Sequence, residues 1–138
     1  MGSAGIMSES PLSVIVADDD VDVRSLMAIA VSKSGLELID ELPDGNSAWE
    51  AISSFLPDIV VLDVAMPGKS GLDISRLIRA DSRLENIRVI LLSAAADDSS
   101  RQAGYDAGAD EYLVKPFSLR DLAAQLTHVA TTIKVTAR

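Results

Sequence analysis

The chain has 138 residues, of which 48% are hydrophobic and 24% are charged, and its formal net charge at pH 7 is −9. This length suits one globular domain that buries roughly two-thirds of its unfolded surface. The negative charge argues against direct binding to nucleic acid or to an anionic membrane, because both require clustered Lys and Arg. The chain has no cysteine, which excludes disulfides and thiolate metal sites and is compatible with the reducing cytoplasm that we expect.

The first ten residues differ in character from the rest of the chain. Residues 1–10 are expected to be an expression remnant and a flexible N-terminus, with Met7 as a plausible native start, and they lack the pattern of a signal peptide. Residues 11–138 are expected to form a single domain. No apolar run approaches the length of a membrane span.

Strand-like and helix-like segments alternate along the domain. Short apolar runs rich in β-branched residues predict strands at 13–17, 36–40, 59–63, 88–93 and 111–114. Apolar residues at helical spacing predict helices over 21–34, 46–56, 71–82, 98–107 and 119–133. Asn46 or Ser47 is expected to cap the second helix, and Trp49 and Phe55 to face the core. The alternation predicts an α/β fold with a parallel sheet covered by helices on both faces.

The predicted strand ends carry the polar residues that point to a function. These are Asp18 and Asp19 after the first strand, Asp63 at the end of the third, Ser93 at the end of the fourth and Lys115 after the fifth. Ligands of open α/β sheets bind beyond the carboxyl ends of the strands, so these side chains should converge. Clustered carboxylates repel one another unless a hard cation such as Mg²⁺ is present. A carboxylate nucleophile, a divalent ion and a mobile cation are the parts of a phosphoryl-transfer site.

Each of these residues also has a purely structural interpretation. An acid at position 63 can serve as a turn-entry residue, and an acidic triplet after a strand can simply favour a helix N-terminus. The agreement of four strand ends favours the functional interpretation. His128, the only histidine, is expected at a solvated helix position, because no partner residues accompany it. The Lys115–Pro116 peptide bond is expected to be cis, because it sits in a tight turn before proline.

Four segments in this order resemble the response-regulator receiver domains of two-component signalling, and the resemblance extends from residue 13 to about 132. The segments are Val16–Asp20, Leu62–Pro67, Leu92–Ala94 and Gly108–Phe117. The resemblance implies a flavodoxin-like sheet in the order 2-1-3-4-5. It also implies a cytoplasmic domain that takes a phosphoryl group from a sensor histidine kinase or a histidine phosphotransfer protein. Such a domain catalyses its own phosphorylation and dephosphorylation and is not an enzyme in the usual sense.

The resemblance also implies a role for each residue of the acidic site. Asp63 would accept the phosphoryl group. Asp19 and Asp63 would hold Mg²⁺ directly, Asp18 would act through water, and the carbonyl of Ala65 would be a further ligand.

Other residues would read out the phosphorylated state. The resemblance implies that Ser93 and Lys115 contact the phosphoryl oxygens and that Tyr112 moves inward with Ser93. This movement would switch the surface made by the fourth and fifth strands and the helices that follow them. The resemblance also places the kinase-docking surface at the start of the first helix. Ala65 and Ala95 stand where relatives often carry larger polar groups, so we expect self-dephosphorylation to be slower than in an Ala65→Asn variant.

Two other functional classes remain open from the sequence. The pair Asp18 and Asp20 after an apolar strand resembles the nucleophile motif of small haloacid-dehalogenase-like phosphatases, in which the first Asp is phosphorylated. A receiver-like interaction module that is never phosphorylated is the other alternative. The expected receiver is either a single-domain regulator or part of a longer protein, and its output partner stays unknown.

Overall fold

The structure is a computed structural model that describes residues 11–136, with side chains described through Ile133. The expected N-terminal remnant at residues 1–10 lies outside the described residues. The described chain forms ten elements in strict alternation of strand and helix. They are β1 (Ser13–Ala17), α2 (Val21–Lys33), β2 (Glu37–Leu42), α3 (Gly45–Phe55), β3 (Ile59–Asp63), α4 (Gly71–Ala80), β4 (Arg88–Ser93), α5 (Asp98–Asp106), β5 (Glu111–Val114) and α6 (Leu119–Thr136).

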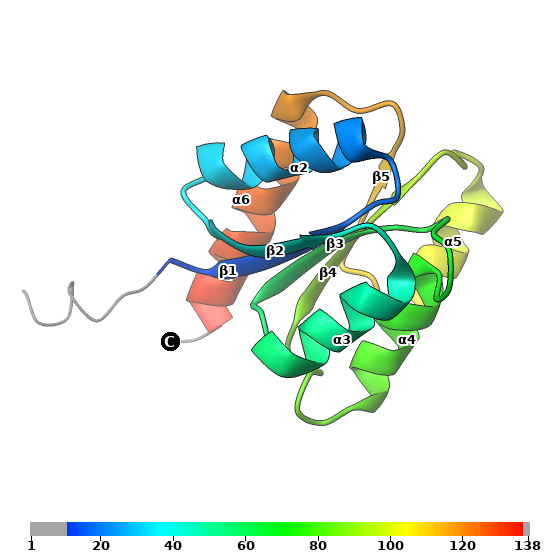
Figure 1. The fold of residues 1–138 in the computed structure, drawn as a ribbon, viewed down its shortest axis with the longest axis horizontal. Helices are drawn as coiled ribbons and strands as arrows, with labels where there is room; N and C mark the ends of the chain where they lie inside the picture. Colours follow the sequence, from blue (N-terminus) through cyan, green and yellow to red (C-terminus); the bar gives the residue numbers. More distant parts are fainter. Residues whose placement is uncertain (1–10, 137–138) are drawn as a thin grey trace, which may run out of the picture.

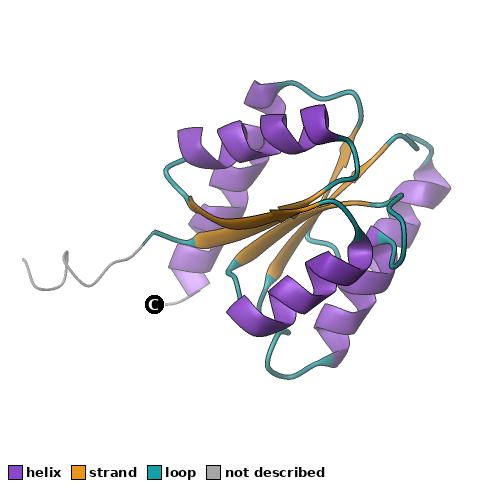
Figure 2. Ribbon diagram, in the orientation of Figure 1, coloured by secondary structure: helices purple, strands orange, loops and turns teal. Residues whose placement is uncertain are grey.

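The five strands form one parallel sheet in the order β2-β1-β3-β4-β5, as the sequence analysis expected. Helices α2 and α6 cover one face of this sheet, and α3, α4 and α5 cover the other (Figure 1). Figure 2 shows the resulting three layers, with the strands between two groups of helices. The order reverses direction at β1 and β3, and the crevice that binds ligands in doubly wound sheets lies at such a point.

Each face of the sheet has its own hydrophobic core. Ile15, Val60 and Leu62 point toward α3 and α4, whereas the neighbouring Val16 and Val61 point toward α2 and α6. The central strand β3 is buried along its whole length. A strand buried on both faces reads as a continuous apolar run, which is why residues 59–62 gave a clear signal.

Several element boundaries differ from the sequence-based expectation. Asp44, and not Asn46 or Ser47, caps α3, because its carboxylate accepts a hydrogen bond of 2.7 Å from the backbone N–H of Ser47. Phe55 was expected in the core but is 55% exposed. It is the last residue of α3, and the chain leaves the helix through Leu56 in the left-handed conformation (φ 52°). Trp49 is partly buried against the core, as expected.

Other boundary expectations are confirmed or need small changes. Ser118 and Asp121 exchange hydrogen bonds of 3.0 and 3.1 Å at the start of α6, which is the expected capping arrangement. Strand β2 runs two residues further than expected, because its pairing with β1 continues to Leu42 past a register shift. Helix α4 ends at Ala80 and not at residue 82. Within residues 11–136, no helix is both long enough and apolar enough to cross a bilayer.

Candidate functional site

Three carboxylates meet at the carboxyl end of the sheet, as their positions at the strand ends predicted. Oxygen atoms of Asp18, Asp19 and Asp63 all lie within 4.8 Å of one another. Asp18 is fully buried and Asp63 is 4% exposed, whereas Asp19 faces solvent. Close carboxylates with one solvent-facing member suit a hard, partly hydrated cation.

Lys115 joins this cluster from the other side of the crevice. Its Nζ lies 2.8 Å from Oδ2 of Asp18 and 3.1 Å from Oδ1 of Asp63. The Lys115–Pro116 peptide bond is cis, as expected, and the Lys115 N–H donates a hydrogen bond of 2.8 Å to the carbonyl of Ser93. The end of β4 therefore fixes the backbone from which the ammonium reaches the two acids.

The electrostatics of the site follow from burial and close charges. Burial raises the pKa of Asp63, and the negative charge of Asp18 raises it further, although the ammonium of Lys115 opposes both effects. Burial alone would lower the pKa of Lys115, but its hydrogen bonds to Asp18 and Asp63 outweigh burial and raise that pKa. With all four groups ionised the cluster carries two uncompensated negative charges, which a divalent cation would neutralise.

The loop after Asp63 is held close to the site by two glycines. A Cβ at Gly71 would lie 2.5 Å from the carbonyl oxygen of Asp63, and a Cβ at Gly45 would overlap the carbonyl of Lys69. The Gly45 N–H also donates a hydrogen bond of 2.9 Å to the carbonyl of Pro67. Within this loop the methyl of Ala65 is exposed beside the acids. A small side chain here leaves the Asp63 carboxylate approachable from solvent.

Ser93 and Tyr112 share one small cavity of about 120 Å³ between β4, β5, α4 and α5. The Ser93 hydroxyl accepts a hydrogen bond of 3.1 Å from the N–H of Ala95, and the Tyr112 hydroxyl donates one of 2.7 Å to the carbonyl of the same residue. Tyr112 is 6% exposed, so its ring is already inside. The two residues expected to act as a pair are therefore linked through the backbone of one residue, Ala95.

Helix α5 packs against the ring of Tyr112 on β5. The guanidinium of Arg101 lies 5.3 Å from the centre of that ring, which is cation–π geometry. A Cβ at Gly104 would approach the ring to 2.7 Å, and the ring of Tyr105 lies 6.5 Å away in a tilted arrangement. Only a glycine at position 104 therefore lets the helix lie this close to Tyr112.

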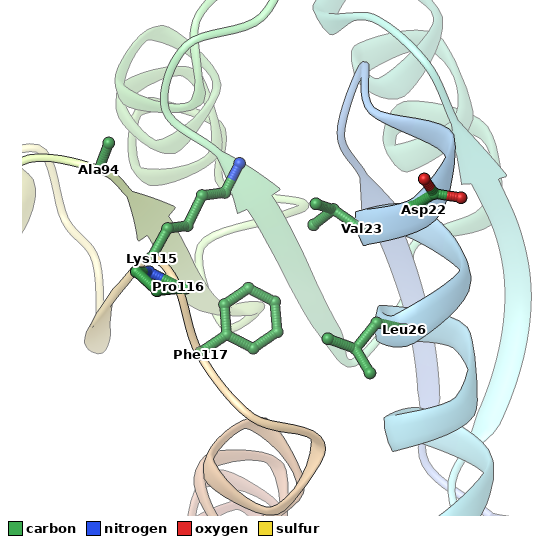
Figure 3. Close-up of a pocket in the computed structure, with 7 residues that line it drawn as sticks. All are labelled: Asp22, Val23, Leu26, Ala94, Lys115, Pro116 and Phe117. Atoms are coloured by element: carbon green, nitrogen blue, oxygen red, sulfur yellow. The ribbon is translucent and has the colours of Figure 1, made fainter.

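A hollow of about 500 Å³ adjoins Lys115 on the side of α2 (Figure 3). Val23 and Leu26 of α2 point across it toward Phe117, and Asp22 stands at its edge. The hollow is thus largely apolar and lies beside the ammonium that contacts Asp63.

Arg24 has a role that the sequence analysis missed. Its guanidinium donates a hydrogen bond of 2.8 Å to the carbonyl of Asp18 and lies 3.5 Å from Glu41 of β2. The side chain is 16% exposed, so it braces the loop of the acidic site. Arg24 directly follows Val23 and so does not share the helix face that lines the hollow. This position was the signal in the sequence that Arg24 points elsewhere. His128 lies on α6, apart from the carboxyl end of the sheet, and is 64% exposed and 3.7 Å from Glu111, as expected for a solvated position.

Comparison with known proteins identifies the class of protein that this fold and site define. The family model of the response regulator receiver domain matches residues 14–127. The chain therefore belongs to the response-regulator receiver family of two-component systems.

Individual relatives agree with that family. The chain is 40% identical over 116 residues to response regulator MprA of Mycolicibacterium vanbaalenii, a match that covers 84% of this chain and 49% of MprA. It thus spans about half the length of this relative. Among solved structures, chemotaxis response regulator CheY4 of Vibrio cholerae superposes with a TM-score of 0.80 at 25% identity, covering 87% of this chain and 99% of CheY4. The BeF3-activated DrrB receiver domain gives 0.78 at 28% identity, covering 88% and 99%.

Proposed function

We propose that this domain is a phosphoacceptor in which Asp63 takes a phosphoryl group and thereby changes the surface around α5. The proposed domain comprises residues 11–138. One observation carries the proposal. Three carboxylates lie within 4.8 Å of one another, and the ammonium of Lys115 contacts two of them, Asp18 and Asp63. Membership of the receiver family supports it.

The chemistry assigned to the site is the transfer of a phosphoryl group from a phosphohistidine to Asp63. An oxygen of the Asp63 carboxylate attacks phosphorus in line, the new O–P bond forms, and the P–N bond breaks with its electron pair returning to the imidazole nitrogen. Lys115 and Ser93 neutralise or hydrogen-bond the phosphoryl oxygens. Mg²⁺ held by Asp19, Asp63 and the Ala65 carbonyl, with Asp18 acting through water, would supply charge neutralisation of the attacking carboxylate and of the phosphoryl group.

The donor partner is a sensor histidine kinase or a histidine phosphotransfer protein. The hollow lined by Val23, Leu26 and Phe117 supports this assignment, because an apolar surface beside Lys115 suits a protein that must bring its phosphohistidine to Asp63. The DrrB receiver domain is described as activated by BeF3, a mimic of a phosphoryl group, which supports phosphorylation as the input here. A cytoplasmic location fits a chain without cysteine.

The output of the domain is a change in the position of Ser93 and Tyr112. When Ser93 turns toward the phosphoryl oxygens, its hydrogen bond with Ala95 is lost, and the loop that carries the partner carbonyl of Tyr112 is released. The proposed switch therefore biases the β4–α5–β5 region between two arrangements. The same contacts would let phosphorylation reach α5 through Tyr112.

The geometry favours Asp63 over Asp18 as the acceptor, which argues against a phosphatase of the haloacid-dehalogenase type. Asp18 is fully buried, and both of its carboxylate oxygens already accept hydrogen bonds, one from the N–H of Asp20 and one from Lys115. An attacking carboxylate needs a free oxygen and a path for the incoming phosphorus. Asp63 is 4% exposed, against 0% for Asp18, and the exposed Ala65 follows it by two residues.

Incubation with labelled acetyl phosphate and Mg²⁺ tests the proposal. We expect one acid-stable, base-labile phosphoryl group per chain, mapped to Asp63 by mass spectrometry. Asp63→Asn should abolish the label, whereas the control Asp98→Asn, at an exposed carboxylate on α5, should keep it. Chelation of Mg²⁺ should stop labelling. A label on Asp18 would instead support the phosphatase assignment, and no label at all would support an interaction module that is never phosphorylated.

A further inference from the structure

A second hollow, away from the acidic site, lies between the end of α2 and the start of α6. These two helices run side by side on one face of the sheet (Figure 1). The hollow has a volume of about 500 Å³, and its lining consists of Lys33, Ser34, Arg120, Ala123, Ala124, Thr127 and His128. We call this set the basic hollow. Its lining contains no carboxylate, in a chain with 21 acidic residues and 12 Lys and Arg.

The cations of the basic hollow are exceptional in their lack of partners. Among the side chains described through residue 133, the other Lys and Arg residues have an ion pair, a hydrogen bond or a ring contact. Lys33 and Arg120 have none. In a protein of net charge −9, intramolecular carboxylates are abundant, yet both free cations face the same hollow.

The stability of the helices explains the position of only one of these two cations. Lys33 lies in the last turn of α2, where a positive charge is favourable to the helix dipole. Arg120 lies in the first turn of α6, where a positive charge is unfavourable by a similar argument. Arg120 therefore weakens its own helix slightly and pairs with nothing inside the described chain, which indicates that its partner lies outside.

The floor of the basic hollow is held by contacts between the two helices and is lined by small side chains. The Ser34 hydroxyl donates a hydrogen bond of 2.8 Å to the carbonyl of Ala30 and lies 3.5 Å from the carbonyl of Ala123 on α6. This contact ties the end of α2 to α6. The methyl groups of Ala123 and Ala124 leave room between the cations, so an extended segment can approach the helices closely.

We propose that the basic hollow binds an acidic segment of another protein, whose carboxylates pair with Lys33 and Arg120 while His128 borders the site. Charge complementarity carries this choice of partner. A second copy of this chain docking through the same face is disfavoured, because a two-fold contact would bring the same cations against one another. The basic hollow is also distinct from the hollow beside Lys115. Val23 and Lys33 are ten residues apart on α2, which corresponds to about 15 Å along the helix axis.

A fluorescent ten-residue polyglutamate peptide is the probe for the first experiment. Its binding to the whole chain is followed by anisotropy at low ionic strength, against the double variant Lys33→Glu/Arg120→Glu. The matched control is Arg76→Glu/Arg83→Glu, at exposed positions on and after α4. Both double variants change the net charge equally. We expect at least tenfold weaker binding for the variant of the basic hollow and less than a twofold change for the control.

Three outcomes would overturn the proposal. Equal losses in both double variants would show a non-specific charge effect. Displacement of the peptide by inorganic triphosphate at equal molar concentration would show a small-anion site. Sedimentation of the unmodified chain as a dimer that Lys33→Glu/Arg120→Glu disrupts would show a contact between copies. Labelling of Asp63 by acetyl phosphate should be the same in the variant and in the unmodified chain, so failure here and failure of the proposed function are distinguishable.

Discussion

The amino and carboxyl ends of the sheet differ in how their charged side chains are paired. At the amino end, Arg79 donates to Asp110 at 2.8 Å and to the carbonyls of Gly108, Glu85 and Ile87 at 2.6–2.9 Å. The Asp110 carboxylate also accepts a hydrogen bond from the N–H of Val89. At the carboxyl end, three carboxylates lie together, and the ammonium of Lys115 contacts two of them, Asp18 and Asp63.

The difference separates stability from function. The amino-end network matches donors to acceptors and joins α4 to the loops before β4 and β5. The carboxyl end keeps an excess of negative charge in a partly buried place, which is unfavourable for folding alone. A protein retains such an arrangement where the charge is used, and four substitutions test this contrast.

The largest effect is expected from Lys115→Met, which removes the ammonium that contacts the carboxylates of Asp18 and Asp63. Leaving Asp18 and Asp63 without it should lower the free energy of unfolding by about 3 kcal/mol at pH 7. The pKa of Lys115 is raised in the folded chain, so its contribution is fully present below its unfolded value of 10.5 and is lost as pH rises through the higher folded value. Urea denaturation from pH 7 to 11 measures this. An unchanged stability would mean that the acids do not need the ammonium.

The next effect is expected from Arg79→Met at the amino end. Loss of its hydrogen bonds should lower the free energy of unfolding by about 2 kcal/mol, because several carbonyls and Asp110 lose a charged donor. The rate of phosphoryl incorporation from acetyl phosphate should stay within twofold of the unmodified chain. A large fall in that rate, measured under conditions where the variant is folded, would contradict the separation of the two ends.

A smaller effect of opposite sign is expected from Asp63→Asn. Burial, followed by repulsion from Asp18, raises the pKa of Asp63, so the folded chain prefers the neutral carboxyl. Its favourable contribution is present below the unfolded value of 3.8 and is lost as pH rises through the folded pKa. Without Mg²⁺ the variant should therefore be more stable at pH 7, by about 1 kcal/mol, and the gain should disappear below pH 4. A gain that persists at low pH would point to another cause.

The smallest effect is expected from Ala65→Asn and concerns the lifetime of the phosphoryl group. The exposed methyl of Ala65 leaves the site open but supplies no group to orient an attacking water. An amide there should position that water and speed self-dephosphorylation by about threefold to tenfold with Mg²⁺ saturating. Decay of the labelled proteins decides this, with Ala65→Ser as a smaller polar control. An equal or slower decay for Asn would show that access, and not positioning, limits hydrolysis.

The contrast between the two ends also shows what the sequence could predict. Asp18, Asp63 and Lys115 stand at or directly after the ends of strands. Locating the strands in the sequence was therefore enough to predict that these residues lie at the carboxyl end of the sheet. Their convergence follows from the rule for parallel sheets. The strand order came from the resemblance to receivers.

The amino end was not predicted, because its contacts have no local pattern. Arg79 and Asp110 are 31 residues apart, and Arg79 sits at an ordinary position near the end of a helix. An acid directly before a strand, as at Asp58 and Asp110, was the available signal: Asp58 accepts hydrogen bonds from both the N–H and the hydroxyl of Ser13. The capping of α3 by Asp44 was missed because three neighbouring residues could all serve as caps.

The attachment of α5 through Tyr112 has a consequence for motion on slow timescales. Among the nine residues of α5, Gly104 alone is buried, and it lies against the Tyr112 ring. The amide hydrogens of this helix should therefore exchange with solvent through one shared opening event, well below the free energy of global unfolding. Replacing Tyr112 by Leu should accelerate exchange along the whole helix together. Residues 98–106 would then behave as one cooperative unit whose closure depends on a single aromatic ring.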